Sequence, residues 1–210
     1  MKNLITEAIG TFFLVLTVGL TVIPQSPFAP LAIGCALMIM VYMGGPISGG
    51  HFNPAVTLAV WMRGKLPPAQ VLPYWLAQIT GALLAAITVR IVLGSTFAPS
   101  PAANLLPALL VELLFTFALA LVVLNTATSA ATAGNSYFGL AIGFTIVVAA
   151  FAGGPVSGGA FNPAVGIGPT LVHLTGGGSI SDLWLYIVGP LAGGALAALV
   201  FRVQHAGVVD

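Results

Sequence analysis

The chain carries very few charged residues. Lys, Arg, Asp and Glu make up 4% of its 210 residues, whereas a soluble domain contains about 25%. Such a chain lacks the ionic surface that keeps a folded protein dissolved in water, and 59% of its residues are hydrophobic. The mean hydropathy of +1.11 is typical of a protein embedded in a lipid bilayer. The composition therefore favours an integral membrane protein over any soluble class.

Runs of one charge and pairs of cysteines are also missing. The net charge is +1 and no basic or acidic run occurs, which argues against a nucleic-acid partner and against peripheral attachment to lipid head groups. Cys35 is the only cysteine, so an intrachain disulfide and a cysteine metal cluster are both excluded. Because no nucleophile–base pair or metal-ligand cluster stands out, we expect no catalytic residue, no metal, no cofactor and no enzymatic activity.

Long apolar runs, separated by turn-rich gaps, are what the chain does contain. Six of them predict membrane-spanning helices: Leu4–Ile23, Leu31–Met43, Pro68–Leu93, Leu105–Leu124, Tyr137–Ala152 and Leu183–Val203. The first run could be a signal peptide, but it is long for one, it contains Glu7, and further spans follow it. We therefore expect it to remain as the first helix.

Thirteen residues occur twice with only two differences, in the segments Gly44–Val56 and Gly153–Val165. This near-exact repeat, in register at a spacing of 109 residues, predicts two related halves at approximately residues 1–95 and 105–205. We expect the halves to form a single transmembrane domain over residues 1–210.

A short apolar stretch begins near the end of each copy, at Asn53–Met62 and Asn162–His173. As a helix, each stretch would be ~15 Å long, half of a hydrocarbon core of ~30 Å. Three spans separate the two stretches, so they enter the membrane from opposite faces and the halves are inverted repeats. Half-spanning segments in matching positions of two halves indicate a functional site between them.

The basic residues predict the orientation of the chain in the membrane. With the N-terminus inside the cell, Lys2, Arg63, Lys65 and Arg202 fall on the cytoplasmic side and Arg90 falls outside. This distribution agrees with the excess of Lys and Arg that cytoplasmic loops carry. We therefore expect both termini to be cytoplasmic, and the membrane to be a bacterial inner membrane.

Each copy of the repeat ends in an Asn-Pro-Ala triplet, Asn53-Pro54-Ala55 and Asn162-Pro163-Ala164. Asn is a favoured N-cap and Pro suits the first helical turn, so each triplet predicts the start of a short helix near the membrane midplane. Two helix N-termini at that depth repel cations, and the Asn amides add hydrogen-bond donors.

The Ser-Gly-Gly segment before each triplet is predicted to run extended, with main-chain carbonyls left free as acceptors. The carbonyls expected to line the path are those of Gly49, Gly50, His51, Phe52, Gly158, Gly159 and Ala160. Donors at the centre with acceptors on either side suit a narrow path for water or small neutral hydroxylated solutes.

The chain resembles the aquaporins, or major intrinsic proteins, along essentially its whole length. The resemblance rests on the segments Ser48–Thr57 and Ser157–Ala164, with support from Glu7, Glu112 and Gly81. It implies an all-α membrane protein with six transmembrane helices and two half-spanning re-entrant helices. It also implies a pore in each protomer and a homotetramer in the bilayer. In the family, the counterparts of Glu7 and Glu112 brace the non-helical loops.

One position departs from the family pattern. Most aquaporins have an arginine directly after the second triplet, and this chain has Val165. The resemblance places the three other residues of that constriction at Ile33, Ala150 and Gly159. A constriction of these four residues is uncharged, apolar and widened. It favours larger neutral solutes, such as glycerol, urea or neutral arsenic and metalloid acids, beside water. The alternative is that Val165 is neutral drift and the pore passes water as usual.

Two other functions fit part of the pattern. A secondary transporter also has inverted repeats and broken helices, and a carboxylate inside the membrane, such as Glu7 or Glu112, could then couple transport to protons. A non-conducting membrane scaffold is the other possibility, but it leaves the paired Asn residues and the carbonyl ladder unexplained.

Overall fold

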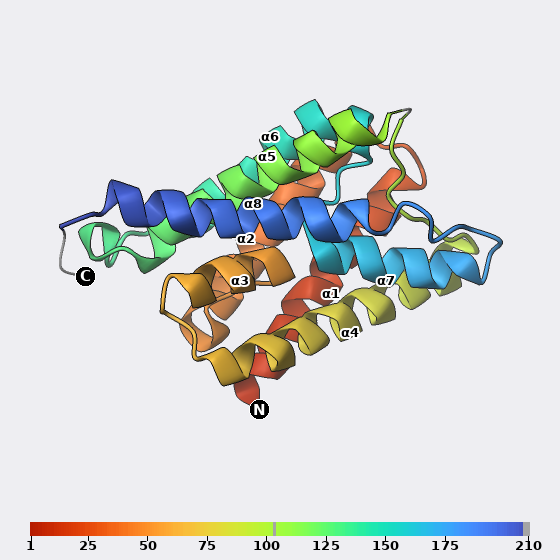
Figure 1. Cartoon of the computed structure of the whole chain (residues 1–210). Helices are drawn as coiled ribbons and strands as arrows, with labels where there is room; N and C mark the ends of the chain where they lie inside the picture. Colours follow the sequence, from red (N-terminus) through yellow and green to blue (C-terminus); the bar gives the residue numbers. More distant parts are fainter. Residues whose placement is uncertain (103, 208–210) are drawn as a thin grey trace.

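The computed structural model describes residues 1–102 and 104–207, which form a bundle of long helices around two short ones (Figure 1). The six long helices are α1 (Lys2–Val22), α2 (Ala29–Ser48), α4 (Pro68–Leu93), α5 (Leu105–Val123), α6 (Phe138–Ser157) and α8 (Leu185–Gln204). The two short helices are α3 (Pro54–Met62) and α7 (Pro163–Leu174). All six long helices are long and apolar enough to cross a membrane. The predicted all-α fold with six spanning and two half-spanning helices is confirmed.

Helices α2 and α6 are longer than the apolar runs that predicted them. Each continues through a Gly-Gly-Pro sequence, keeps Pro46 or Pro155 inside the helix, and ends at Ser48 or Ser157. The prediction of an extended Ser-Gly-Gly segment is therefore wrong. The serine is the last helical residue, and both following glycines have positive φ angles. Packing within the bundle overrides the weak helix preference of Gly and Pro here.

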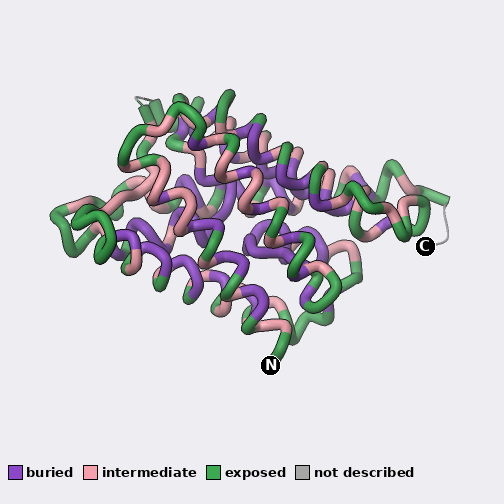
Figure 2. The backbone as a smooth tube through the Cα atoms, turned by 180° about the vertical axis from the view of Figure 1, so that it is seen from behind, coloured by how far each residue is buried: buried purple, intermediate pink, exposed green. Residues whose placement is uncertain are grey.

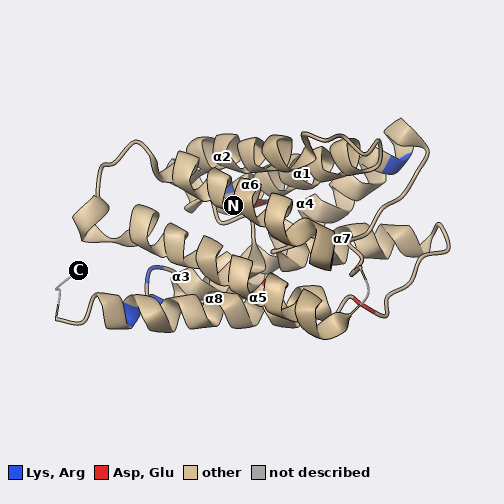
Figure 3. Ribbon diagram, turned by 90° about the horizontal axis from the view of Figure 1, so that it is seen from above, with Lys and Arg blue, Asp and Glu red and all other residues tan. Residues whose placement is uncertain are grey.

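The outer surface of the bundle is apolar. Ile91 is 77% exposed, Leu106 66% and Leu72 62%, although the inward faces of the same helices are buried (Figure 2). A protein in water does not leave so many large apolar side chains exposed around its circumference, whereas lipid chains solvate them well. Charged residues appear only as small coloured patches on an otherwise tan bundle (Figure 3). The chain is an integral, multi-pass membrane protein.

The two halves of the chain use the same helix pairs. Helix α1 packs on α4 and α2 in the first half, as α5 packs on α8 and α6 in the second. Helices α2 and α6 pack on each other and join the halves. Helices α3 and α7 lie between the long helices: α3 packs on α8 and α4, and α7 packs on α4 and α8. The short helices are thus enclosed by protein, where the non-helical backbone that leads into them is tolerated at membrane depth.

Glycines let the backbones of paired helices approach closely. A Cβ atom at Gly81 of α4 would lie 2.2 Å from the carbonyl oxygen of Ala8 in α1. In the second half, a Cβ atom at Gly193 of α8 would lie 2.3 Å from the carbonyl oxygen of Leu113 in α5. Small residues at helix crossings are the usual means of close packing in membranes, since lipid provides no hydrophobic drive for helices to associate.

Replacing Gly81 with alanine is expected to push α1 and α4 apart, because the new methyl group meets main-chain atoms that cannot rotate away. We expect Gly81→Ala to lower the midpoint of heat-induced aggregation in detergent. The matched control is Gly154→Ala in α6, where a Cβ atom meets nothing within 4 Å. This control should be neutral or stabilise the helix by about 0.5–1 kcal/mol. Equal midpoints for the two variants would contradict the packing argument.

Candidate functional site: two loops and a narrow cavity

A four-residue loop leads from each long helix to its short helix, residues 49–52 after α2 and 158–161 after α6. The first loop has φ angles of 92° at Gly49, 63° at Gly50 and 48° at Phe52. The second has 86° at Gly158, 68° at Gly159 and 49° at Phe161 in turn. A non-glycine residue in this left-handed region costs on the order of 1–3 kcal/mol, so other interactions must hold each phenylalanine in place.

The carboxylate of Glu7 provides those interactions in the first half. It is fully buried, and its oxygens accept hydrogen bonds from the backbone N–H of His51 at 3.0 Å and of Phe52 at 2.6 Å. The Ser48 hydroxyl donates to it at 2.7 Å and the Gln78 side-chain amide at 2.8 Å. Four donors surround one buried carboxylate, as a charge removed from water requires.

The carboxylate of Glu112 holds the second loop in the same way. It accepts from the Ser157 hydroxyl at 2.7 Å and from the backbone N–H groups of Ala160 at 2.9 Å and Phe161 at 2.6 Å. A tyrosine completes each brace, because Tyr74 donates its hydroxyl to the Ser48 carbonyl at 2.8 Å and Tyr186 donates to that of Ser157 at 2.5 Å. Both glutamates are thus engaged with the loops, as the resemblance led us to expect.

The first half has a further polar group that the second half lacks. The Gln78 amide donates to the Thr57 hydroxyl at 2.9 Å, and the Thr57 hydroxyl lies 3.1 Å from Nδ1 of His51. At the matching places of the repeat, Ala160 stands for His51 and Gly166 for Thr57. The two brackets are therefore alike in their carboxylates and different in the side chains beside them.

The two Asn side chains tie the halves together. Oδ1 of Asn53 accepts from the backbone N–H of Ala55 at 2.8 Å and caps α3, while its amide donates to the Phe161 carbonyl at 2.9 Å. Asn162 repeats this: it caps α7 through the N–H of Ala164 at 2.9 Å, and its amide donates to the Phe52 carbonyl at 2.8 Å. Each Asn thus caps its own helix and bonds the loop that leads to the other, so the two helix N-termini are fixed face to face.

A cavity of about 40 Å³ runs along these Asn residues. Its walls include all four residues of the constriction that the resemblance implies, Ile33, Ala150, Gly159 and Val165. Of the predicted carbonyl residues, Gly50, His51, Gly159 and Ala160 also line it. Gly49 instead borders two wider cavities, and the Phe52 carbonyl accepts the Asn162 amide.

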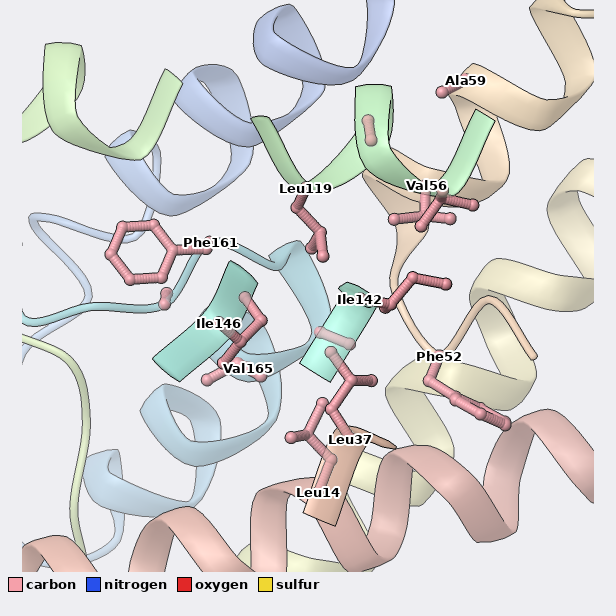
Figure 4. Packing of buried hydrophobic residues seen from close by; sticks show 14 of the residues in the cluster. Leu14, Leu37, Phe52, Val56, Ala59, Leu119, Ile142, Ile146, Phe161 and Val165 are labelled. Atoms are coloured by element: carbon pink, nitrogen blue, oxygen red, sulfur yellow. The ribbon is translucent and has the colours of Figure 1, made fainter. Parts of the chain in front are cut away.

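Most of the remaining wall is aliphatic, and the sequence reasoning did not identify it. The additional lining residues are Leu14, Val18, Leu37, Val56, Leu119, Val123, Ile142, Ile146 and Phe161. Figure 4 shows several of these side chains pointing into the space between the helices. The signal in the sequence is the repeat itself, since Leu14 and Leu119 are 105 residues apart and Leu37 and Ile146 are 109 apart.

The cavity opens toward wider spaces on the side of the bundle where α1 begins and α8 ends, which we name the termini side. One such space, of about 330 Å³, shares His51 and Val123 with the narrow cavity. A second, of about 510 Å³, is lined by Val41, Lys65 and residues of the segment 126–135. Of the described residues on the wall of the narrow cavity, His51 is the one with a titratable side chain.

This arrangement defines a membrane channel: an apolar-walled path through a helical bundle, with two opposed helix starts and their Asn donors at its centre. A family model described as "Major intrinsic protein" matches residues 1–201. The chain therefore belongs to the major intrinsic protein family, whose members form channels for water and small neutral solutes.

Relatives from plants and bacteria agree with this assignment. Aquaporin NIP1-1 of Zea mays is 37% identical, over 96% of this chain and 74% of its own length. Nodulin-26 of Glycine max is 35% identical, over 97% of this chain and 78% of its own. A glycerol uptake facilitator protein-like 6 of Lactiplantibacillus plantarum is 37% identical, over 97% and 98%.

A solved structure has the same fold. The X-ray structure of the aquaglyceroporin from Plasmodium falciparum matches with a TM-score of 0.88, over 100% of this chain and 98% of that one. The two sequences are 22% identical, so the likeness concerns the arrangement of the helices.

Removing the charge of a bracing carboxylate should loosen its loop. In Glu112→Gln, an amide replaces a carboxylate that accepts two backbone N–H groups and one hydroxyl. We expect a loss of about 2 kcal/mol or more in stability, because hydrogen bonds to a charged group contribute about 1.5–3 kcal/mol. The thermal midpoint in detergent measures this loss. Asp182→Asn, the same chemical change at a partly exposed carboxylate, is the control and should leave the midpoint unchanged.

The tie between the halves can be broken while the helix cap is kept. Asn53→Asp still presents an oxygen to the Ala55 N–H, but it cannot donate to the Phe161 carbonyl, and it places two acceptors against each other. We expect lower stability and lower water permeability in proteoliposomes. Asn104→Asp is the matched control, since Asn104 precedes α5 and makes no side-chain cap bond. Wild-type permeability in Asn53→Asp would show that the tie is dispensable.

Proposed function

We propose that this chain is a passive channel for water and larger neutral solutes, with an apolar, uncharged constriction formed by Ile33, Ala150, Gly159 and Val165. The observation that carries the proposal is that these four residues line one narrow cavity together with both Asn residues. Val165 is 5% exposed and buried in that wall. Val165 stands where the family usually has an arginine, so the constriction offers neither a fixed charge nor a side-chain donor.

The chemistry of the wall sets the class of solute. A constriction without a charge or a side-chain donor does not replace the hydrogen bonds that a strongly hydrated ion loses, so ions are excluded by desolvation. Small neutral molecules lose less. Glycerol, urea and neutral arsenic or metalloid acids are therefore the proposed solutes beside water. The similarity to a glycerol uptake facilitator-like protein supports glycerol in particular.

We also propose that the termini side faces the cytoplasm of a bacterial cell, that the protein resides in the inner membrane, and that it assembles as a homotetramer. The Lys and Arg residues support the orientation, because four of the five follow the positive-inside rule when the termini lie inside. The two halves, at about residues 1–95 and 105–205, act as one channel domain.

No observation favours a secondary transporter. Such a protein needs a group that binds and releases an ion between two conformations. The candidates inside the membrane, Glu7 and Glu112, each accept at least three hydrogen bonds from the loops and neighbouring side chains. Their assigned work is to hold the loops, and proton coupling would have to break those bonds in every cycle.

Replacing Val165 with arginine should convert the constriction to the common form. The side chain adds bulk and a positive charge, so we expect Val165→Arg to reduce glycerol permeability by about tenfold, an effect equal to about 1.4 kcal/mol, and water permeability much less. Stopped-flow light scattering on proteoliposomes measures both. Val165→Leu separates size from charge, because it adds bulk alone and should give an intermediate loss. Unchanged glycerol permeability in Val165→Arg would place the constriction elsewhere.

A further inference from the structure

The wall of the narrow cavity is built twice, once from each half of the chain. Three of the four proposed constriction residues have a partner 109 residues away that lines the same cavity: Val165 with Val56, Ile33 with Ile142, and Gly159 with Gly50. The partners stand one turn inward from Asn53, on α6, and in the first loop. Because the halves are inverted, these three partners lie on the termini side of the Asn pair.

The fourth position differs between the two ends. The partner of Ala150 is Val41, which is larger, is 2% exposed, and borders the wide space of about 510 Å³ instead of the narrow cavity. Leu119 and Val123, on the last turns of α5, complete the aliphatic wall there. Nothing at the termini side thus compensates for the three repeated residues by adding space.

The narrow cavity also ends at this place. It shares His51 and Val123 with the space of about 330 Å³, so the change from a confined path to a wide vestibule occurs at these residues. In Figure 4 the side chains of Val56, Leu119 and Ile142 approach one space from three helices. A solute that leaves the Asn pair toward the termini side must pass between them.

We propose that Val56, Ile142 and Gly50 form a second apolar constriction, and that it limits the flux of larger neutral solutes in series with the constriction at Val165. This inference rests on the proposed function, because it takes the first constriction as given. It makes Val56 and Ile142 specificity-determining residues. Selectivity in this channel is then set at two places, one on each side of the membrane midplane.

The polar groups between the two constrictions fit this scheme. Each Asn amide has two N–H donors, and one of them is used for the bond to a Phe carbonyl of the opposite loop. The other N–H of each amide is left for a solute in the cavity that both residues line. A solute is therefore desolvated at an aliphatic ring, hydrogen-bonded at the Asn pair, and desolvated again at the second ring.

The test compares two substitutions that the repeat makes equivalent, Val165→Ala and Val56→Ala, and the double variant. Glycerol permeability is measured in proteoliposomes by stopped-flow light scattering, per amount of reconstituted protein, with water permeability as the measure of intact pores. Two equal barriers in series each contribute half of the resistance, so each single change raises glycerol permeability by at most about twofold, while the double change exceeds the product of the two. Val172→Ala, a buried valine of α7 away from the cavity, is the control and should change nothing.

The second variant guards against a folding defect at Val56. Ile142→Val enlarges the same ring from α6 and should raise glycerol permeability in the same direction as Val56→Ala. The inference is overturned if both variants keep wild-type glycerol permeability in vesicles with normal water permeability while Val165→Ala gives the full gain of the double variant. In that case the proposed function stands and the second constriction does not. If Val165→Ala and Val165→Arg also leave glycerol permeability unchanged, the proposed function itself has failed.

Discussion

The structure depends on two buried carboxylates, each placed where it can bind the backbone of a loop that no regular helix can satisfy. Glu7 and Glu112 accept the N–H groups that residues 51–52 and 160–161 expose at membrane depth. Without these bonds the left-handed conformations at Phe52 and Phe161 would have no compensation, and unpaired donors would remain in a medium without water. The same carboxylates that look like candidates for proton transfer are the reason that the loops hold their shape.

Once the loops are fixed, the remaining chemistry of the pore follows from them. The loops deliver Asn53 and Asn162 to the centre, where each caps one short helix and bonds the carbonyl before the other. The helix N-termini then face each other with partial positive charge, which opposes cations. The aliphatic wall on either side of this pair leaves size and the cost of desolvation as the main criteria for passage.

Part of this was predictable from the sequence and part was not. Asn followed by Pro predicts a capped helix start locally, and the two short helices begin at Pro54 and Pro163 as expected. The roles of Glu7 and Glu112 came from a resemblance, because their partners lie more than 40 residues away. The bonds from Asn53 and Asn162 to the Phe carbonyls span 108 and 110 residues and depend on how two loops meet. The Gly-Gly-Pro sequences read as helix ends, yet α2 and α6 continue through them because neighbouring helices supply the packing.

The central claim is passive conduction of water and of a larger neutral solute by one pore. The most direct measurement is the flux of water and glycerol into proteoliposomes that contain the unmodified protein, over a range of glycerol concentrations and with and without a proton gradient. The account predicts permeability to both above that of empty vesicles, proportional to the concentration difference and independent of the proton gradient. Saturable uptake that requires the gradient, or no permeability above that of empty vesicles, would contradict it.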